Sequence, residues 1–240
     1  MTKKALNQNA KYVQELENIV EPDFIFINKP INRFKTTNDK NNTSQTLNKK
    51  ERLIELSKKI NSIENCNLKD NSKNLIMGDG DINSPIMLVG EAPGEKEDIS
   101  GHSFQGDVGE LLKKMLNALN IKQENVYLSY SINFKPPEDR KPTSQEIKRY
   151  SIFLKEHISI IDPKIIILMG STAMEAVIGL NKKIFNERGN WKEIILNNKT
   201  YPIIITLSQS YLLRFSENKK YSWEDLKKIR KKIKDLKINI

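Results

Sequence analysis

The sequence predicts an α/β protein with three α/β/α layers, in which helices cover both faces of a mostly parallel central sheet. Two observations carry this prediction. Apolar runs at residues 85–90, 164–170 and 203–207 have the length and composition of buried strands. Segments with apolar residues at helical spacing lie between these runs, and strands that alternate with helices form parallel sheets.

The other elements follow from the same two periodicities. They are helices at residues 50–64, 107–119, 143–161, 171–179 and 222–238, a strand at 125–134, and two strands joined by a turn within 191–207. Thr143 or Ser144, followed by Glu146, is the expected start of the helix at 143–161. Ser171 is the expected N-cap of the next helix.

Residues 1–49 are predicted to form an N-terminal extension and flexible linker, followed by one domain over residues 50–240. Residues 4–19 are typical of a short helix, and residues 23–28 form a short apolar patch. Residues 35–50 carry almost no apolar side chains, so this stretch cannot bury enough surface to order itself.

The bulk composition limits the classes of protein and partner. The chain has 40 Lys and Arg against 30 Asp and Glu, a net charge of +10, which favours a polyanion such as DNA but also fits ordinary solubility. No apolar run reaches the ~18–20 residues that span a bilayer, and the N-terminus lacks a signal core. We therefore expect a cytoplasmic monomer that binds no membrane. Cys66, a single cysteine, excludes an internal disulfide and an all-cysteine metal site.

A glycine-rich loop leaves the first predicted strand with the sequence VGEAPGEKEDISGHSFQG, residues 89–106. Its glycines permit close approach of a ligand to the backbone, and a phosphate-binding P-loop is excluded because no Gly-Lys-Ser/Thr follows. One interpretation is a pocket with a carboxylate that positions water and with Phe104 stacked on a planar ligand. The alternative is an exposed turn whose phenylalanine tucks into the core.

Two further loops are candidates. The sequence NFKPPEDRKPT, residues 133–143, holds Lys135, Arg140 and Lys141 between prolines, which suits a phosphate backbone but is also common in surface loops. The sequence PIIITLSQSYLLRF, residues 202–215, places three neutral polar side chains between a buried strand and the next packed element.

In this order and spacing, the motifs GEAPG…ED..G..F.G, the proline-rich loop with its arginine and PT, LMGSTA, RG and YLLR resemble the family 4 uracil-DNA glycosylases. The resemblance covers residues 74–240. It implies that a uracil is flipped out of DNA and that its N-glycosidic bond is hydrolysed in base excision repair. Glu91 would be the catalytic carboxylate and Phe104 the stacking ring. The implied pocket wall is Gly90, Ala92, Pro93 and Gly94, and the implied DNA contacts are Lys135, Arg140, Ser171, Ser210 and Arg214.

The chain departs from this family at the substrate positions. Tyr130 stands where an asparagine would read the uracil edge. Ser208 stands where a histidine would donate to the uracil oxygen, and Gln209 follows it in place of a proline; both occupy catalytic positions. Of the two histidines, His102 in the glycine-rich loop is a weaker candidate, and His157 is expected only to pack in a helix.

The chain also departs at the iron–sulfur site of the family, which needs four cysteines. Cys66 is the one remaining cysteine, with Ile63 and Tyr150 at two of the other positions. We therefore expect no cluster, no other cofactor and no metal.

Three functional hypotheses remain open. The leading one is a uracil-DNA glycosylase. The alternative is a homologue that keeps the fold and binds DNA without excising bases, and the third is an α/β enzyme acting on another small planar substrate.

Overall fold

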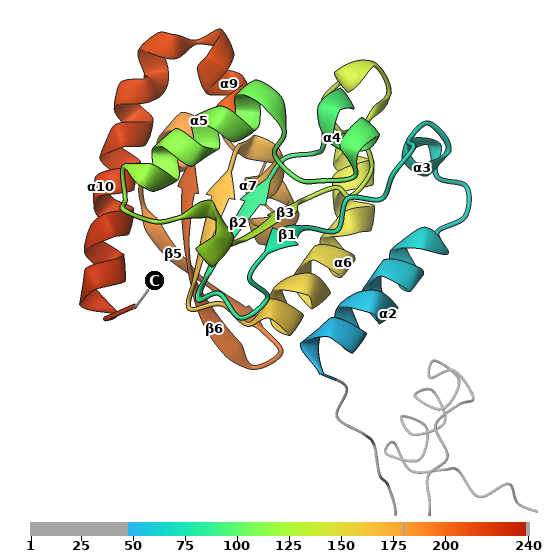
Figure 1. The fold of residues 1–240 in the computed structure, drawn as a ribbon, viewed down its shortest axis with the longest axis horizontal. Coiled ribbons are helices and arrows are strands. Elements are labelled where there is room, and N and C mark those ends of the chain that lie inside the picture. The colour runs from blue at the N-terminus through green and yellow to red at the C-terminus, as the bar shows by residue number, and fades with distance from the viewer. Residues whose placement is uncertain (1–47, 180, 239–240) are drawn as a thin grey trace, which may run out of the picture. The chain divides into compact units, whose positions relative to one another are not determined.

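The computed structural model describes residues 48–179 and 181–238 (Figure 1). Its centre is a six-stranded sheet in the order β1-β3-β2-β4-β6-β5. The strands are β1 (Asp79–Gly80), β2 (Ile86–Gly90), β3 (Tyr127–Tyr130), β4 (Ile165–Met169), β5 (Trp191–Leu196) and β6 (Lys199–Thr206). Strands β3, β2, β4 and β6 are parallel, and the edge strands β1 and β5 pair antiparallel. The predicted α/β class with a mostly parallel sheet is confirmed.

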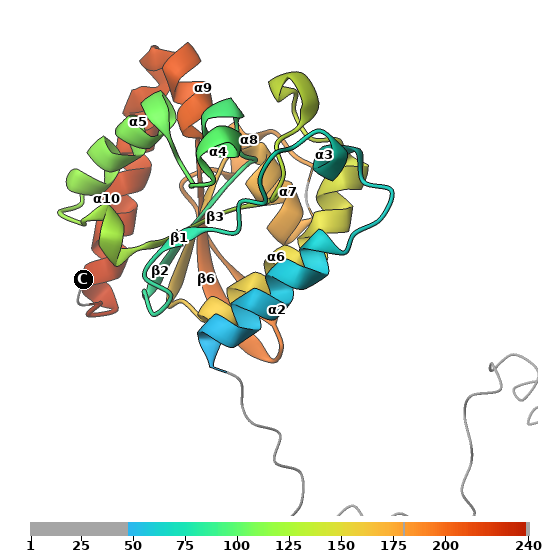
Figure 2. The ribbon, with the colours of Figure 1, turned by 45° about the vertical axis from the view of Figure 1, so that its right-hand side comes forward.

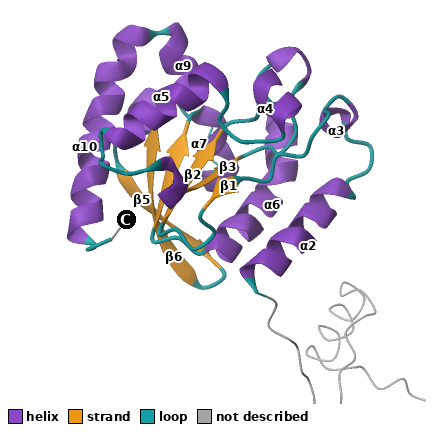
Figure 3. Cartoon of the chain, viewed as in Figure 1, coloured by secondary structure: helices purple, strands orange, loops and turns teal. Residues whose placement is uncertain are grey.

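Helices cover both faces of this sheet, as Figure 3 shows by colour. They are α2 (Lys49–Asn61), α3 (Asn67–Asp70), α4 (Glu95–Ser100), α5 (Gly106–Asn117), α6 (Ser144–Ile161), α7 (Ser171–Ile178), α8 (Ile184–Glu187), α9 (Gln209–Arg214) and α10 (Lys219–Asp235). In Figure 2, α5 and α10 lie on one side of the sheet, and α2 and α6 lie on the other. Within the described ranges, no helix has both the length and the apolar character needed to cross a bilayer.

The sheet is buried on both faces because its strands are apolar throughout. Every residue of β2 and β4 is buried. Met87 and Val89 belong to the core shared with α2, α6 and α7, whereas Ile86 and Leu88 belong to the core shared with α5, α9 and α10. Successive side chains of a strand point to opposite faces, so continuous apolar runs are what a doubly covered parallel sheet requires.

Some local expectations are confirmed and others are wrong. Thr143 caps α6 and exchanges hydrogen bonds with Glu146, as predicted for a capping box. The cap of α7 is Gly170 and not Ser171, because the backbone there has a φ of +105° that suits glycine. Helix α10 begins at Lys219, three residues before its predicted start.

The predicted strand at 125–134 ends at Tyr130, after which the chain continues beside the loop that follows β2. Helices α4 and α8 and strand β1 were not predicted. The expected helix at 4–19, the apolar patch at 23–28 and most of the linker at 35–50 lie outside the described residues. Their separation from a domain at 50–240 stays a prediction.

Candidate functional site

The carboxyl ends of the parallel strands open onto a pocket of about 600 Å³. Its lining includes residues 90–94 from the end of β2 onward, Tyr130 at the end of β3, residues 169–172 from the end of β4 onward, and residues 207–211 after β6. The proline-rich loop before α6 also contributes to the lining. Open α/β sheets place their ligand sites in this crevice at the carboxyl ends of the strands.

The pocket brings together nearly all of the residues that the sequence predicts for the site. Those in its lining are Gly90, Glu91, Ala92, Pro93, Gly94, Phe104, Tyr130, Arg140, Ser171, Ser208, Gln209, Ser210 and Arg214. Lys135 is outside the lining, and its ammonium group pairs with Asp139 at 3.4 Å. The chemical roles of these residues stay predictions, but their shared location follows from the sheet topology.

A buried carboxylate, Glu97 in α4, fixes the shape of the glycine-rich loop. Its Oε2 accepts a hydrogen bond from Gly94 N at 3.0 Å, and its Oε1 accepts one from Gln105 N at 2.8 Å. These bonds are shielded from water because Glu97 is 5% exposed. No role for Glu97 is predicted from the sequence. The available signal was its spacing of three residues from Gly94, as in a capping box.

Phe104 and Tyr130 stack on each other in the pocket wall. Their ring centroids are 4.6 Å apart, and the ring planes are inclined by 18°. Each residue is only 4% exposed. Gly90 makes the pair possible, because a Cβ at this position would lie 2.8 Å from an atom of each ring. The phenylalanine that was expected to stack on a ligand therefore stacks on a tyrosine of the same chain.

Hydrogen bonds hold this stacked pair in place. The hydroxyl of Tyr130 accepts a hydrogen bond from Phe104 N at 2.9 Å and donates to Glu97 Oε1 at 3.4 Å. Burial, followed by the nearby Glu97 carboxylate, raises the pKa of Tyr130 well above its usual value, so the phenol stays neutral. Phe104 has a φ of +52°, which few residues other than glycine adopt. Gly109 leaves room for the carbonyl oxygen of Phe104, because a Cβ at position 109 would lie only 1.9 Å from that oxygen.

Glu91 reaches from the end of β2 to the start of α7. Its Oε1 accepts a hydrogen bond from Thr172 N at 3.1 Å and a longer one from Ser171 Oγ at 3.4 Å. Lys141 Nζ in turn donates to Ser171 Oγ at 2.9 Å. The first amides of a helix have no partner within the helix, so they attract an acceptor oxygen such as Glu91 Oε1. The first amides of α7 thus face a carboxylate of the protein itself.

Ser208 and Gln209 both make internal contacts. Ser208 Oγ caps α9 by accepting from Tyr211 N at 3.4 Å, and it lies 3.2 Å from Ser210 Oγ. The Gln209 amide nitrogen lies 3.0 Å from the sulfur of Met169, and Gln209 is 2% exposed. Neither side chain offers the long, ring-borne donor of a histidine at this position.

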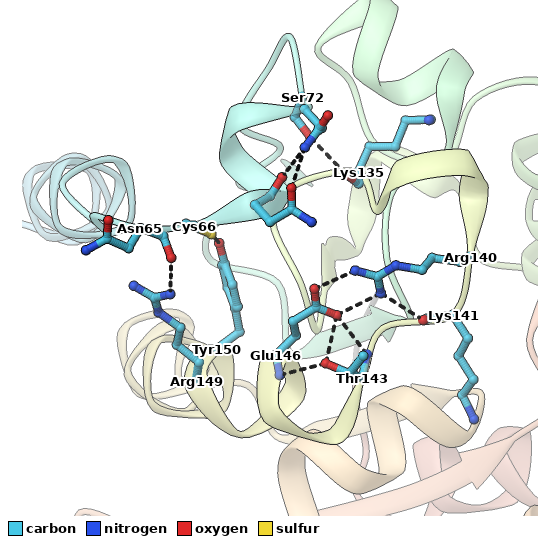
Figure 4. A network of polar contacts seen from close by, with 12 residues as sticks. Asn65, Cys66, Ser72, Lys135, Arg140, Lys141, Thr143, Glu146, Arg149 and Tyr150 are labelled. Carbon is cyan, nitrogen blue, oxygen red and sulfur yellow. Dashed lines mark hydrogen bonds and ion pairs between the residues drawn. The ribbon is translucent and has the colours of Figure 1, made fainter.

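Arg140, which was expected to contact DNA, is held by an ion pair. Its two terminal nitrogens donate to the two carboxylate oxygens of Glu146 at 2.9 and 2.7 Å (Figure 4). The hydrogen bonds from Arg140 outweigh partial burial and hold the pKa of Glu146 at about 2. This bidentate pair fixes the proline-rich loop to the first turn of α6.

The surroundings of Cys66 do not fit an iron–sulfur cluster. Cys66 Sγ lies 3.2 Å from Tyr150 Oη, and both residues are buried (Figure 4). The ring of Phe134 packs edge to face on Tyr150 with centroids 6.4 Å apart. A cluster needs several thiolates, whereas this donor set is one thiol beside a phenol. Among the described residues, no three His, Cys, Asp or Glu side chains gather as metal ligands.

A buried ion pair holds the end of strand β6, which leads into the pocket. The carboxylate of Asp225 in α10 accepts from Arg188 at 3.1 and 2.6 Å and from Thr206 Oγ1 at 2.8 Å. Asp225 is fully buried, and Thr206 lies two residues before Ser208. The RG motif therefore contributes to positioning the strand end that leads into the pocket.

Comparison with known proteins agrees with this arrangement. A family model described as the Uracil DNA glycosylase superfamily matches residues 77–230. The type-4 uracil-DNA glycosylase of Thermotoga maritima is 34% identical over 189 residues, which is 77% of this chain and 97% of that protein. The type-4 enzyme of Sulfurisphaera tokodaii is 31% identical over 74% of this chain and 83% of its own length. The chain belongs to the uracil-DNA glycosylase superfamily.

Proposed function

We propose that this chain binds damaged DNA across the pocket and has lost the excision of uracil. The observation that carries the proposal is the stacked pair of Phe104 and Tyr130, since the tyrosine covers the aromatic face on which a flipped uracil would stack. Membership of the superfamily, the net charge of +10, and Lys141 and Arg214 in the pocket lining support DNA as the partner.

The polar groups of the pocket argue in the same direction. Tyr130 offers one hydroxyl, which is already engaged by Phe104 N and Glu97, in place of an amide that could read both a donor and an acceptor of uracil. Ser208 caps α9 in place of a histidine that would donate to the leaving base. Losing one donor to a developing oxyanion costs about 10²–10³ in rate.

Uracil excision is the second candidate, and the position of Glu91 favours it. Its carboxylate is in the pocket lining and is oriented by Thr172 N. In that reaction Glu91 would position a water and accept its proton as the water oxygen bonds to C1′ of the deoxyribose, while the N-glycosidic bond breaks and uracil leaves as the anion. A variant of this candidate is excision of another damaged base whose shape suits the remaining pocket.

Base release and DNA binding are measured together to test the proposal. Single- and double-stranded oligonucleotides with uracil or other lesions are incubated with wild type and with Glu91→Ala. We expect salt-dependent binding and no release above the variant. Release by wild type alone would establish the second candidate, and no binding at low salt would refute the proposal.

The double variant Tyr130→Asn with Ser208→His sharpens this test. If wild type keeps the fold and lacks only the asparagine and histidine side chains that would bind uracil, the double variant should release uracil and wild type should not. Equal release by the two proteins would contradict the assignment of Tyr130 and Ser208 as the residues that prevent excision.

A further inference from the structure

We propose that the pocket selects DNA from which a base is already missing, an abasic site, with the ring of Tyr130 in the place of the absent base. This inference rests on the proposed DNA binding and names the lesion that the site takes. It starts from the stacked pair: Tyr130 lies on Phe104 with a centroid distance of 4.6 Å, a separation typical of stacked aromatic rings.

The stacked pair leaves little of its own aromatic surface for a base. Phe104 and Tyr130 are each 4% exposed, so neither ring presents an open face to an incoming nucleotide. Gly90 lies against both rings at distances that exclude even a methyl group, which shows that the pair fills the space beside β2. A flipped base would have to displace one of the rings in order to stack on the covered face of the other.

Displacing Tyr130 would also break a buried hydrogen-bond network. Its hydroxyl satisfies Phe104 N at 2.9 Å and lies 3.4 Å from Glu97 Oε1. Moving the ring out would leave the Phe104 amide, at a residue with a φ of +52°, without this acceptor. The network therefore holds the tyrosine in the pocket wall and opposes its exchange for a base.

The rest of the pocket suits a sugar and its phosphates. Beside the two rings, the lining includes the hydroxyls of Ser208 and Ser210, the carboxylate of Glu91, and the cations Lys141 and Arg214. Hydroxyls and carboxylates hydrogen-bond to sugar oxygens, and cations attract phosphates. An abasic nucleotide also has no base to unstack, so its entry avoids the main cost of flipping.

Equilibrium binding by fluorescence anisotropy tests the inference on the full chain. Three duplexes of identical sequence carry, at the central position, a tetrahydrofuran abasic analogue, a deoxyuridine or the normal nucleotide. We expect the abasic duplex to bind at least about tenfold more tightly than the other two, because a base need not be unstacked. Equal affinity for all three would overturn the inference but leave the proposed DNA binding standing. Failure to bind any of them at low salt would refute the DNA binding itself.

Variants of β3 connect the preference to the ring. Tyr130→Phe keeps the ring, so it should keep the preference for the abasic duplex. Tyr130→Ala opens the space, so the ratio between abasic and uracil duplexes should fall toward one. Tyr127→Phe is the matched control, because Tyr127 lies on the same strand and contacts His157 away from the pocket lining. An unchanged ratio in a folded Tyr130→Ala protein would overturn the assignment. If that variant does not fold, the comparison of the three duplexes with wild type still decides.

Discussion

Lowering the pH from neutral is expected to destabilise the protein through His157. This residue of α6 is 2% exposed, its Nε2 lies 2.8 Å from Tyr127 Oη, and its Nδ1 lies 3.4 Å from Ser129 Oγ. Burial lowers the pKa of His157 to about 4, whereas a histidine in an unfolded chain titrates near ~6.5. Both partners are in β3, so this buried histidine joins α6 to that strand.

The size of the effect follows from the two pKa values. Between them the unfolded chain binds a proton that the folded chain excludes, so stability rises with pH in this range. The contribution is complete above a pH of about 6.5 and is lost as the pH falls toward the folded value. At about 1.4 kcal/mol per pH unit, the loss in the free energy of unfolding amounts to roughly 3 kcal/mol over the whole window.

Urea unfolding, followed by the fluorescence of the two tryptophans, measures this slope at pH values from about 7.5 to about 4.5. His157→Gln should flatten the dependence of the unfolding free energy on pH. His102→Gln is the matched control, because the side chain of His102 is 70% exposed and its Nδ1 lies 3.3 Å from a carboxylate oxygen of Asp79. Equal slopes for wild type and His157→Gln would refute the reasoning.

Three further predictions concern the supports of the pocket. Gly170→Ala should lower the free energy of unfolding by about 1–3 kcal/mol in thermal melts, because its φ is +105° and a Cβ would lie 2.3 Å from the Glu91 carboxyl carbon. Gly179→Ala is the control: its φ is +74° and a Cβ there would have no atom within 4 Å, so its effect measures the backbone strain without a clash. Asp225→Ala should cost about 3 kcal/mol by urea unfolding, because it removes the buried carboxylate that pairs with Arg188 and leaves that guanidinium the longer ion pair with Glu224 at 3.5 Å; a loss within about 1 kcal/mol would contradict this. Cys66→Ala should cost only about 1 kcal/mol, and a chelator should not change the melting temperature of either protein; a collapse of the fold would show that the thiol holds more than a hydrogen bond.

Much of the fold could be predicted from the sequence because its signals are local and periodic. The runs that became β2 and β4 are apolar at every position, and the helices between them repeat every three or four residues. Alternating strands and helices leave few topologies, and parallel strands bring their carboxyl ends to one edge. The common location of Glu91, Phe104 and Ser208 at that edge could therefore be expected from the chain order.

The arrangement inside the pocket could not be predicted in this way. The direction of the Tyr130 ring depends on the space above Gly90 and on the backbone angle of Phe104, which are set by residues far apart in the chain. The role of Glu97 depends on the short helix α4, whose six residues carry no apolar periodicity. The bidentate pair of Arg140 leaves no separate signal in the sequence, because its partner Glu146 also fits the capping box of α6.

The strained backbone of Phe104 has a consequence for the energetics of recognition. A residue with a positive φ persists only where its surroundings over-determine it, and here a phenol, a carboxylate and two glycines do so. A ligand that meets such a preformed wall loses little affinity to the conformational entropy of the protein. Selectivity in this protein would then come from rigidity, with the wall excluding every ligand that needs the two rings to separate.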